Sequence, residues 1–227
     1  RLEVNDAGEF TLYVGIGDVG QGSSTALVQI AAEVLRQRVG EIKLGAGDTD
    51  CCPDSGVTAA SRVTYIVGRA VQIAAEKLKG FLQDAAAQMI GMPSETLRLD
   101  NGFFHCPDNP QRRVSVPQAV GALKAKGIPL CVEGIYDPEF VALDPKTGQG
   151  KPMATYTFAT QAALVAVDLE SGEVEVLSVV ACHDVGTAVN PDSVTGQIEG
   201  VVSMGLGFSL MEEVLLEKGR IVNPGYS

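Results

Sequence analysis

The chain has 227 residues, of which 45% are hydrophobic and 20% charged, a composition typical of a folded globular protein and not of a disordered one. Its formal net charge of −11 argues against nucleic-acid binding, because a phosphate backbone selects clustered lysine and arginine. No apolar run approaches the roughly 18 residues of a membrane helix and no signal peptide opens the sequence, so we expect a cytoplasmic protein without membrane contact.

A glycine-rich loop follows the first predicted strand, Phe10 to Ile16, and precedes a helix whose apolar residues recur at helical spacing from Leu27 to Leu35. Free N–H groups and the positive end of the helix dipole at such a junction attract a phosphate. The residues that open the helix carry hydroxyls, which could cap it or hydrogen-bond the same anion. These residues are Ser23, Ser24 and Thr25.

Two further interpretations of this loop stay open. Gly15, Gly17 and Gly20 satisfy the G-x-G-x-x-G spacing of a nicotinamide-dinucleotide loop, which needs an acidic residue about 20 positions on, after the next strand. The next predicted strand is Glu41 to Leu44, and the acid after it, Asp48, lies 28 positions beyond Gly20 in a turn-rich segment. A nicotinamide site is therefore the weaker alternative. The other alternative is a glycine-rich helix entry that binds no ligand.

Two more junctions between a loop and a helix are rich in small residues. A long loop over 45–62 leads into a predicted helix that ends near Gln83, and a separate short helix is expected over 85–90. At the third junction, Asn190 is the predicted N-cap and Pro191 the first helical residue. The helix that follows carries four glycines, a costly density unless its backbone packs closely against another group. They are Gly196, Gly200, Gly205 and Gly207.

The remaining elements indicate an α+β fold with mixed, largely antiparallel sheets and long amphipathic helices. Beyond residue 90 we expect a strand over 96–99, a hairpin turn at 100–102, a strand at 103–104, a helix over 117–126 and a strand over 128–135. Residues 136–152, rich in Pro, Gly and Asp, indicate a surface loop or a crossing between subdomains. Extended runs over 155–168 and 173–181 then predict another hairpin.

The five cysteines lack the compact spacing that zinc and iron–sulfur sites need, so we expect no metal ligands in this chain. They are predicted to be buried or inert thiols of a reducing compartment, although Cys51 and Cys52 adjoin the second small-residue junction. His105 is predicted to lie in a surface turn. His183 stands beside Asp184 and either forms an acid–base pair or orders the loop that follows.

Four ordered motifs resemble the molybdopterin-binding region of the xanthine dehydrogenase and aldehyde oxidoreductase family of molybdenum hydroxylases. They are Asp18-Val19-Gly20-Gln21-Gly22, Thr58-Ala59-Ala60-Ser61-Arg62, Asp144 through Gly148 to Pro152, and Asp184-Val185-Gly186 through Asn190-Pro191 to Gly196-Gln197-Ile198-Glu199-Gly200. The resemblance implies a single molybdopterin-binding domain over 1–227. The third motif is most similar to bacterial aldehyde oxidoreductases, which favours the cytosine dinucleotide form of the cofactor.

The resemblance also implies the cofactor-binding residues. Gly20-Gln21-Gly22 matches the loop that binds the pterin and its phosphate, and 58–62 matches the stretch beside the metal and dithiolene. Gln197 matches a glutamine whose amide lies near the molybdenum ligands or the pterin, whereas without the motif it is more simply a solvated or capping residue. The full expected set is Gly20, Gln21, Gly22, Ser23, Ser24, Thr58, Ala59, Ala60, Ser61, Arg62 and Gln197.

The activity implied by the resemblance is oxidative hydroxylation of an aldehyde or purine-like N-heterocycle, with water as the oxygen source and electrons leaving through iron–sulfur clusters. In this family the general base is a glutamate in a Gly-x-Gly-Glu motif near the C-terminus, and a Gly-Gly-Phe-Gly-Gly type loop lies upstream. Neither motif occurs in this sequence. We therefore expect the second half of a large subunit, inactive alone, with [2Fe–2S] and FAD on partner domains or subunits. A non-catalytic subunit of a molybdoenzyme complex is the remaining alternative.

Overall fold

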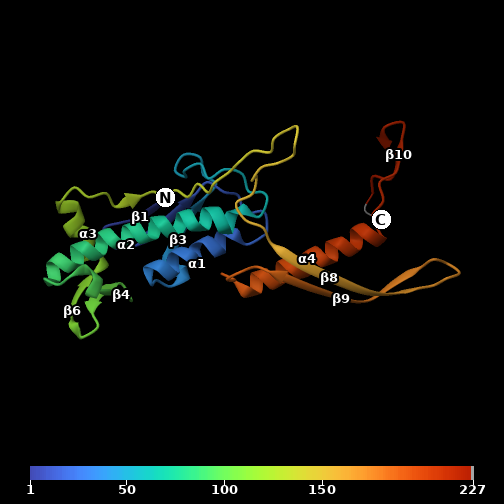
Figure 1. Cartoon of the computed structure of the whole chain (residues 1–227). Coiled ribbons are helices and arrows are strands. Elements are labelled where there is room, and N and C mark those ends of the chain that lie inside the picture. The colour runs from blue at the N-terminus through green and yellow to red at the C-terminus, as the bar shows by residue number, and fades with distance from the viewer. Residues whose placement is uncertain (226–227) are drawn as a thin grey trace. The chain divides into compact units, whose positions relative to one another are not determined.

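The computed structural model describes residues 1–225, which form two compact units that divide between Ala154 and Thr155 (Figure 1). The division follows directly after the segment 136–152, which is irregular apart from an isolated bridge between Val141 and Lys151. Each unit is described by itself.

The first unit is built on a four-stranded sheet with the order β3-β2-β1-β7. Strand β1 (Leu2–Val4) pairs antiparallel with β2 (Phe10–Val14) and with β7 (Cys131–Val132). Strand β3 (Ile42–Ala46) instead runs parallel to β2. Because a parallel pair needs a crossover connection, α1 (Ser23–Leu35) links the two strands and the glycine-rich loop enters it.

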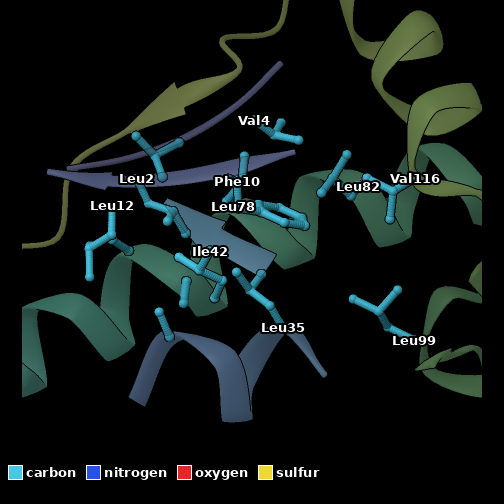
Figure 2. Packing of buried hydrophobic residues seen from close by; sticks show 14 of the residues in the cluster. Leu2, Val4, Phe10, Leu12, Leu35, Ile42, Leu78, Leu82, Leu99 and Val116 are labelled. Carbon is cyan, nitrogen blue, oxygen red and sulfur yellow. The ribbon is translucent and has the colours of Figure 1, made fainter. Parts of the chain in front are cut away.

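The buried face of this sheet packs on α1 and α2 (Gly68–Ile90). Figure 2 shows Phe10 of β2, Leu35 of α1 and Leu78 and Leu82 of α2 in one buried cluster. The three leucines are fully buried and Phe10 is 2% exposed. Since burial of one such side chain contributes about 1.5–3 kcal/mol, this core fixes β2 and α1, and with them the ends of the loop between them.

One long helix replaces the two helices expected up to Ile90. It begins as a π-helical turn, η2 (Val63–Val67), and continues as α2. The expected break near Gln83 is wrong, because buried alanines continue the apolar face over 85–87 without a helix breaker. Gly91 ends the helix in the left-handed region, with φ 73°.

A three-stranded antiparallel sheet and a helix complete the first unit. The sheet has the order β4 (Arg98–Asp100), β5 (Phe103–Cys106), β6 (Asn109–Ser115), and α3 (Val116–Ala125) follows. The turn between β4 and β5 is confirmed, since Asn101 and Gly102 both have positive φ. Short 3₁₀ turns, η1 (Val39–Glu41) and η3 (Ser94–Thr96), precede β3 and β4.

Three details of this region differ from expectation. His105 lies on β5 and not in a turn, and its buried Nδ1 atom has no hydrogen-bond partner among residues 1–225. Strand β6 was not expected because its sequence is mostly polar and it is held by pairing with β5. The strand expected over 128–135 is reduced to the two residues of β7, where β1 offers a partner.

The second unit begins with the expected hairpin, formed by β8 (Phe158–Val167) and β9 (Val174–Asp184). Helix α4 (Pro191–Leu210) follows, and β10 (Leu216–Glu217) pairs with β11 (Arg220–Ile221). The Asn190 side chain accepts the Ser193 N–H at 2.9 Å, which confirms the predicted N-cap. Between 155 and 225 no described residue is buried, so this unit has no hydrophobic core of its own.

The fold class is confirmed as α+β with mixed, largely antiparallel sheets. Within residues 1–225, every helix is too short or too polar to cross a membrane.

Candidate functional site

Two loops that are far apart in the sequence meet at the carboxyl ends of β2 and β3. The Gly15 N–H donates to Ser55 Oγ at 3.0 Å, and Thr58 Oγ1 donates to the Gly17 carbonyl at 3.0 Å. A Cβ on Gly15 would lie 2.1 Å from the Pro53 carbonyl oxygen, so only glycine permits this approach. The structure thus joins the 15–24 and 45–62 loops, which the sequence presents as separate junctions.

Asp18 closes the first loop. Its Oδ1 accepts the N–H groups of Gly20 at 3.0 Å and Gly22 at 3.3 Å, and its Oδ2 accepts the Ser24 N–H at 2.9 Å. The bond from Ser24 is the largest cause that lowers the pKa of the Asp18 carboxyl. Of the two roles left open for the hydroxyls that begin α1, the capping role is wrong, because the N-cap is Gly22 and the acceptor comes from Asp18.

This carboxylate uses N–H groups that were expected to be free for a phosphate. Positive φ at Gly20 (104°) and Gly22 (76°) gives the loop the shape in which both N–H groups reach one oxygen. An anion at the start of α1 would have to displace Asp18. The loop is therefore closed on itself in this structure, and recognition through its side chains is the simpler use.

Gln21 lies in the middle of the closed loop, is half-buried, and folds its side chain back onto the loop. Its Oε1 accepts the Val19 N–H at 2.7 Å, and its Nε2 donates to Ser23 Oγ at 2.7 Å. Ser23 is buried, with 4% of its surface exposed. Because an amide nitrogen carries two protons and its oxygen two lone pairs, Gln21 can still donate and accept once with a ligand.

The second loop carries backbone strain beside this glutamine loop. Ala60 and Ser61 are exposed and have φ of 51° and 52°, in the left-handed region that costs about 1–2 kcal/mol for a residue with a Cβ. Arg62 supports the loop from within, since its Nη1 donates to the carbonyls of Ser55 at 2.7 Å and Val57 at 2.9 Å. Its guanidinium therefore braces backbone here, whereas 59–61 faces solvent.

Gln197 belongs to the second unit, where it is exposed on α4. It lies two turns after the cap at Asn190, so it is not a capping residue, and its exposure fits the other half of the alternative, a solvated residue. The other ten expected cofactor-binding residues all lie in the first unit, eight of them in the two joined loops and Ser23 and Ser24 in the first turn of α1.

The thiols near the second loop are not arranged as a metal site. Cys51 Sγ lies 3.9 Å from Cys52 Sγ, and the Cys52 thiol donates to the Gly45 carbonyl at 3.4 Å. Desolvation is the largest cause that raises the pKa of Cys51 to about 11, so this thiol is neutral. Within the described range 1–225, no three His, Cys, Asp or Glu side chains gather as a potential metal site.

The histidine of the second unit has a partner across the β8–β9 hairpin. His183 Nε2 lies 3.2 Å from Gln161 Nε2, while Asp184 Oδ1 accepts the Gly186 N–H at 3.0 Å. Asp184 thus orders the turn before the Asn190 cap, a role that was expected of His183, whose contact is instead with Gln161 across the hairpin.

The joined loops suit an organic cofactor that brings its own metal ligands. Their polar groups include the Gln21 amide and the hydroxyls of Ser24, Thr58 and Ser61, which donate and accept hydrogen bonds. At Gly17 and Gly20 a Cβ would meet no atom of the described residues within 4 Å, apart from its chain neighbours, so a ligand can approach the backbone.

Sequence reasoning missed the roles of Asp18 and Ser55. One feature of the sequence indicates the role of Asp18: it is an acid two residues before a glycine, a position typical of a side chain that accepts nearby backbone N–H groups. Ser55 gave no signal, because its bond to Gly15 spans 40 positions.

Comparison with known proteins identifies relatives of this arrangement. The family model of the molybdopterin cofactor-binding domain matches residues 1–227. A probable xanthine dehydrogenase subunit from Bacillus subtilis is 33% identical over 220 residues, which cover 97% of this chain and 28% of that protein. The nicotine 6-hydroxylase large subunit of Paenarthrobacter nicotinovorans is 30% identical over 217 residues, with coverages of 94% and 26%.

Solved structures agree. The aldehyde oxidoreductase from Desulfovibrio desulfuricans is similar with a TM-score of 0.71 and 29% identity, covering 91% of this chain and 20% of that chain. Quinoline 2-oxidoreductase from Pseudomonas putida 86 gives a TM-score of 0.78 at 25% identity, with coverages of 97% and 28%. This chain therefore spans less than a third of the length of the relatives it matches.

Proposed function

This chain belongs to the molybdopterin cofactor-binding domain family, and we propose that it holds the pterin of a molybdenum hydroxylase between its two joined loops. The observation that carries the proposal is the bond from Thr58 to Gly17, which joins the Gln21 loop to the loop that carries the strained Ala60-Ser61 segment.

The side chains of these two loops would bind and orient the cofactor. Gln21 offers an amide donor and acceptor that its loop already holds in place. Ala59 and Ala60 would leave room because their side chains are small, and the hydroxyl of Ser61 would hydrogen-bond the pterin. When bound, the molybdenum cofactor would supply the oxidative hydroxylation of an electron-poor carbon with water as the oxygen source.

The nicotinamide alternative has weaker support. Strands β2 and β3 do form a parallel pair around a glycine-rich helix entry, as a dinucleotide site requires. Asp48, however, uses its Oδ1 to accept the Asp50 N–H at 2.9 Å inside its own turn. Family membership favours the pterin.

The finer assignments rest on the resemblance and on the names of relatives. We propose an aldehyde or N-heterocycle as substrate, [2Fe–2S] clusters and FAD on partner domains or subunits, and the remainder of a large subunit to supply the general base. The motif Asp144–Pro152 supports the cytosine dinucleotide form of the cofactor, and cysteine usage supports a cytoplasmic location.

The test is metal and pterin analysis of the natural protein that contains this chain. Molybdenum and a released pterin should both approach one per protein, and Gln21→Ala should lower the pterin content. Gln72→Ala is the matched control, because Gln72 bonds only along the exposed face of α2, to Arg69 and Glu76. Stoichiometric NAD without molybdenum would overturn the proposal.

Gln197 is tested by turnover in the same protein. We expect Gln197→Ala to lower kcat about ten- to hundredfold, because one hydrogen bond to the cofactor is worth on the order of 1–3 kcal/mol. The melting temperature should stay unchanged, since Gln197 is exposed. Normal turnover with full molybdenum content would remove Gln197 from the site.

A further inference from the structure

We propose that Asp18 is a positioning residue of the cofactor site, which fixes the backbone on both sides of Gln21 so that its amide meets the cofactor in one orientation. The inference rests on the proposed function, in which Gln21 binds the pterin.

The geometry around Gln21 carries this inference. The residues on either side of it, Gly20 and Gly22, donate their N–H groups to the same Asp18 oxygen, at 3.0 and 3.3 Å. The second oxygen of Asp18 accepts the Ser24 N–H at 2.9 Å, which ties the loop to the first turn of α1. One carboxylate thus brackets Gln21 and anchors it to the helix.

The glycines make this bracket necessary. Both have positive φ, and glycine loses more conformational freedom on ordering than any other residue. Without the carboxylate, the three N–H groups would turn to water and Gln21 would sample many orientations. Its ordering cost would then be added to cofactor binding, which weakens affinity.

A purely structural role is the competing explanation, because the same bonds cap α1. The two roles predict a different coupling between the effects of substituting Asp18 and Gln21. If Asp18 acts through Gln21, its removal costs nothing further once Gln21 is gone, whereas a general stabiliser has an effect that adds to that of Gln21.

A double-mutant cycle in the natural cofactor-loaded protein separates the two. The variants are Asp18→Ala, Gln21→Ala and the double variant, and the readout is the rate at which pterin is released, followed by the fluorescence of its oxidised form. Asp18→Asn keeps the Oδ1 acceptor and provides a variant that folds if Asp18→Ala does not.

Asp168 provides the matched control. Its Oδ1 accepts the N–H groups of Glu170 at 2.9 Å and Ser171 at 2.7 Å in the β8–β9 turn, so Asp168→Ala removes the same kind of contact outside the proposed site.

We expect Asp18→Ala and Gln21→Ala each to speed release by about tenfold, and the double variant to be no faster than Gln21→Ala alone. Asp18→Asn should recover part of the retention, and Asp168→Ala should match the wild type. Provided that the wild type contains pterin, either of two results would overturn the inference. One is a release rate in the double variant that multiplies the two single effects. The other is release from Asp18→Ala and Asp18→Asn as slow as from Asp168→Ala. A wild type without pterin overturns the proposed function itself.

Discussion

Thr58 and Gly17 lie 41 positions apart, and the Thr58 hydroxyl donates to the Gly17 carbonyl oxygen at 3.0 Å. Together with the bond from the Gly15 N–H to Ser55 Oγ, this contact holds the two small-residue loops against each other. Because the loops follow the parallel strands β2 and β3, the sheet fixes where they begin and these bonds fix where they meet.

Removing the Thr58 hydroxyl should loosen this contact. Thr58→Val keeps the shape of the side chain and loses the donor, so we expect a loss of about 0.5–1.5 kcal/mol in the free energy of unfolding. Thr58→Ser keeps the donor and should lose less. Denaturant unfolding of the three proteins measures the difference, and equal stability of Thr58→Val and wild type would contradict the role of this bond.

Relief of the strain at Ala60 should stabilise the protein. Ala60→Gly removes a Cβ from a residue with φ 51°, and we expect a gain of about 0.5–1 kcal/mol after the greater flexibility of glycine in the unfolded chain is counted. Ala59 is not among the residues with positive φ, so Ala59→Gly should instead destabilise by a similar amount. Thermal unfolding tests this, and the same sign for both variants would refute the strain.

The sequence predicts those parts of the fold that depend on local chemistry. The hairpin at Asn101-Gly102 is predictable because its residues tolerate positive φ, and the cap at Asn190-Pro191 because Asn accepts an N–H and Pro needs none. Strand β6 is not predictable from the sequence, because its pairing with β5 overrides the low strand propensity of its polar residues.

The candidate site is predictable in its residues and not in its contacts. The motifs around Gln21 and 58–62 identify the family, and the family match confirms that resemblance. The bonds of Gly17 to Thr58 and of Gly15 to Ser55 depend on the parallel pairing of β2 and β3, which no short motif encodes.

The stability that Asp18 contributes should be lost in acid. Its pKa is lowered in the folded protein, chiefly by the Ser24 N–H, so the contribution is present above the unfolded value near 3.9 and disappears as the pH falls through the folded value. The melting temperatures of the wild type and of Asp18→Asn should therefore approach each other as the pH falls from 7 to 2. Curves that stay parallel down to pH 2 would contradict this.

Cys51 should resist alkylation at neutral pH. With a pKa of about 11, only about 0.1% of this thiol is thiolate at pH 8. Its modification by iodoacetamide, mapped by mass spectrometry, should accelerate about tenfold per pH unit from 8 to 10. Cys182 is exposed on β9 and serves as the internal reference. A Cys51 rate that levels off near pH 8.5 would disprove the raised pKa.

The position of the Gln21 side chain relative to bound cofactor tests the central claim most directly. A crystal structure of the natural cofactor-loaded protein gives the distance from the Gln21 amide to the pterin. We predict a hydrogen bond of about 2.7–3.2 Å from Gln21 Nε2 or Oε1 to the pterin, with Thr58 still bonded to Gly17. A bound cofactor with the Gln21 amide directed into bulk water would contradict the claim.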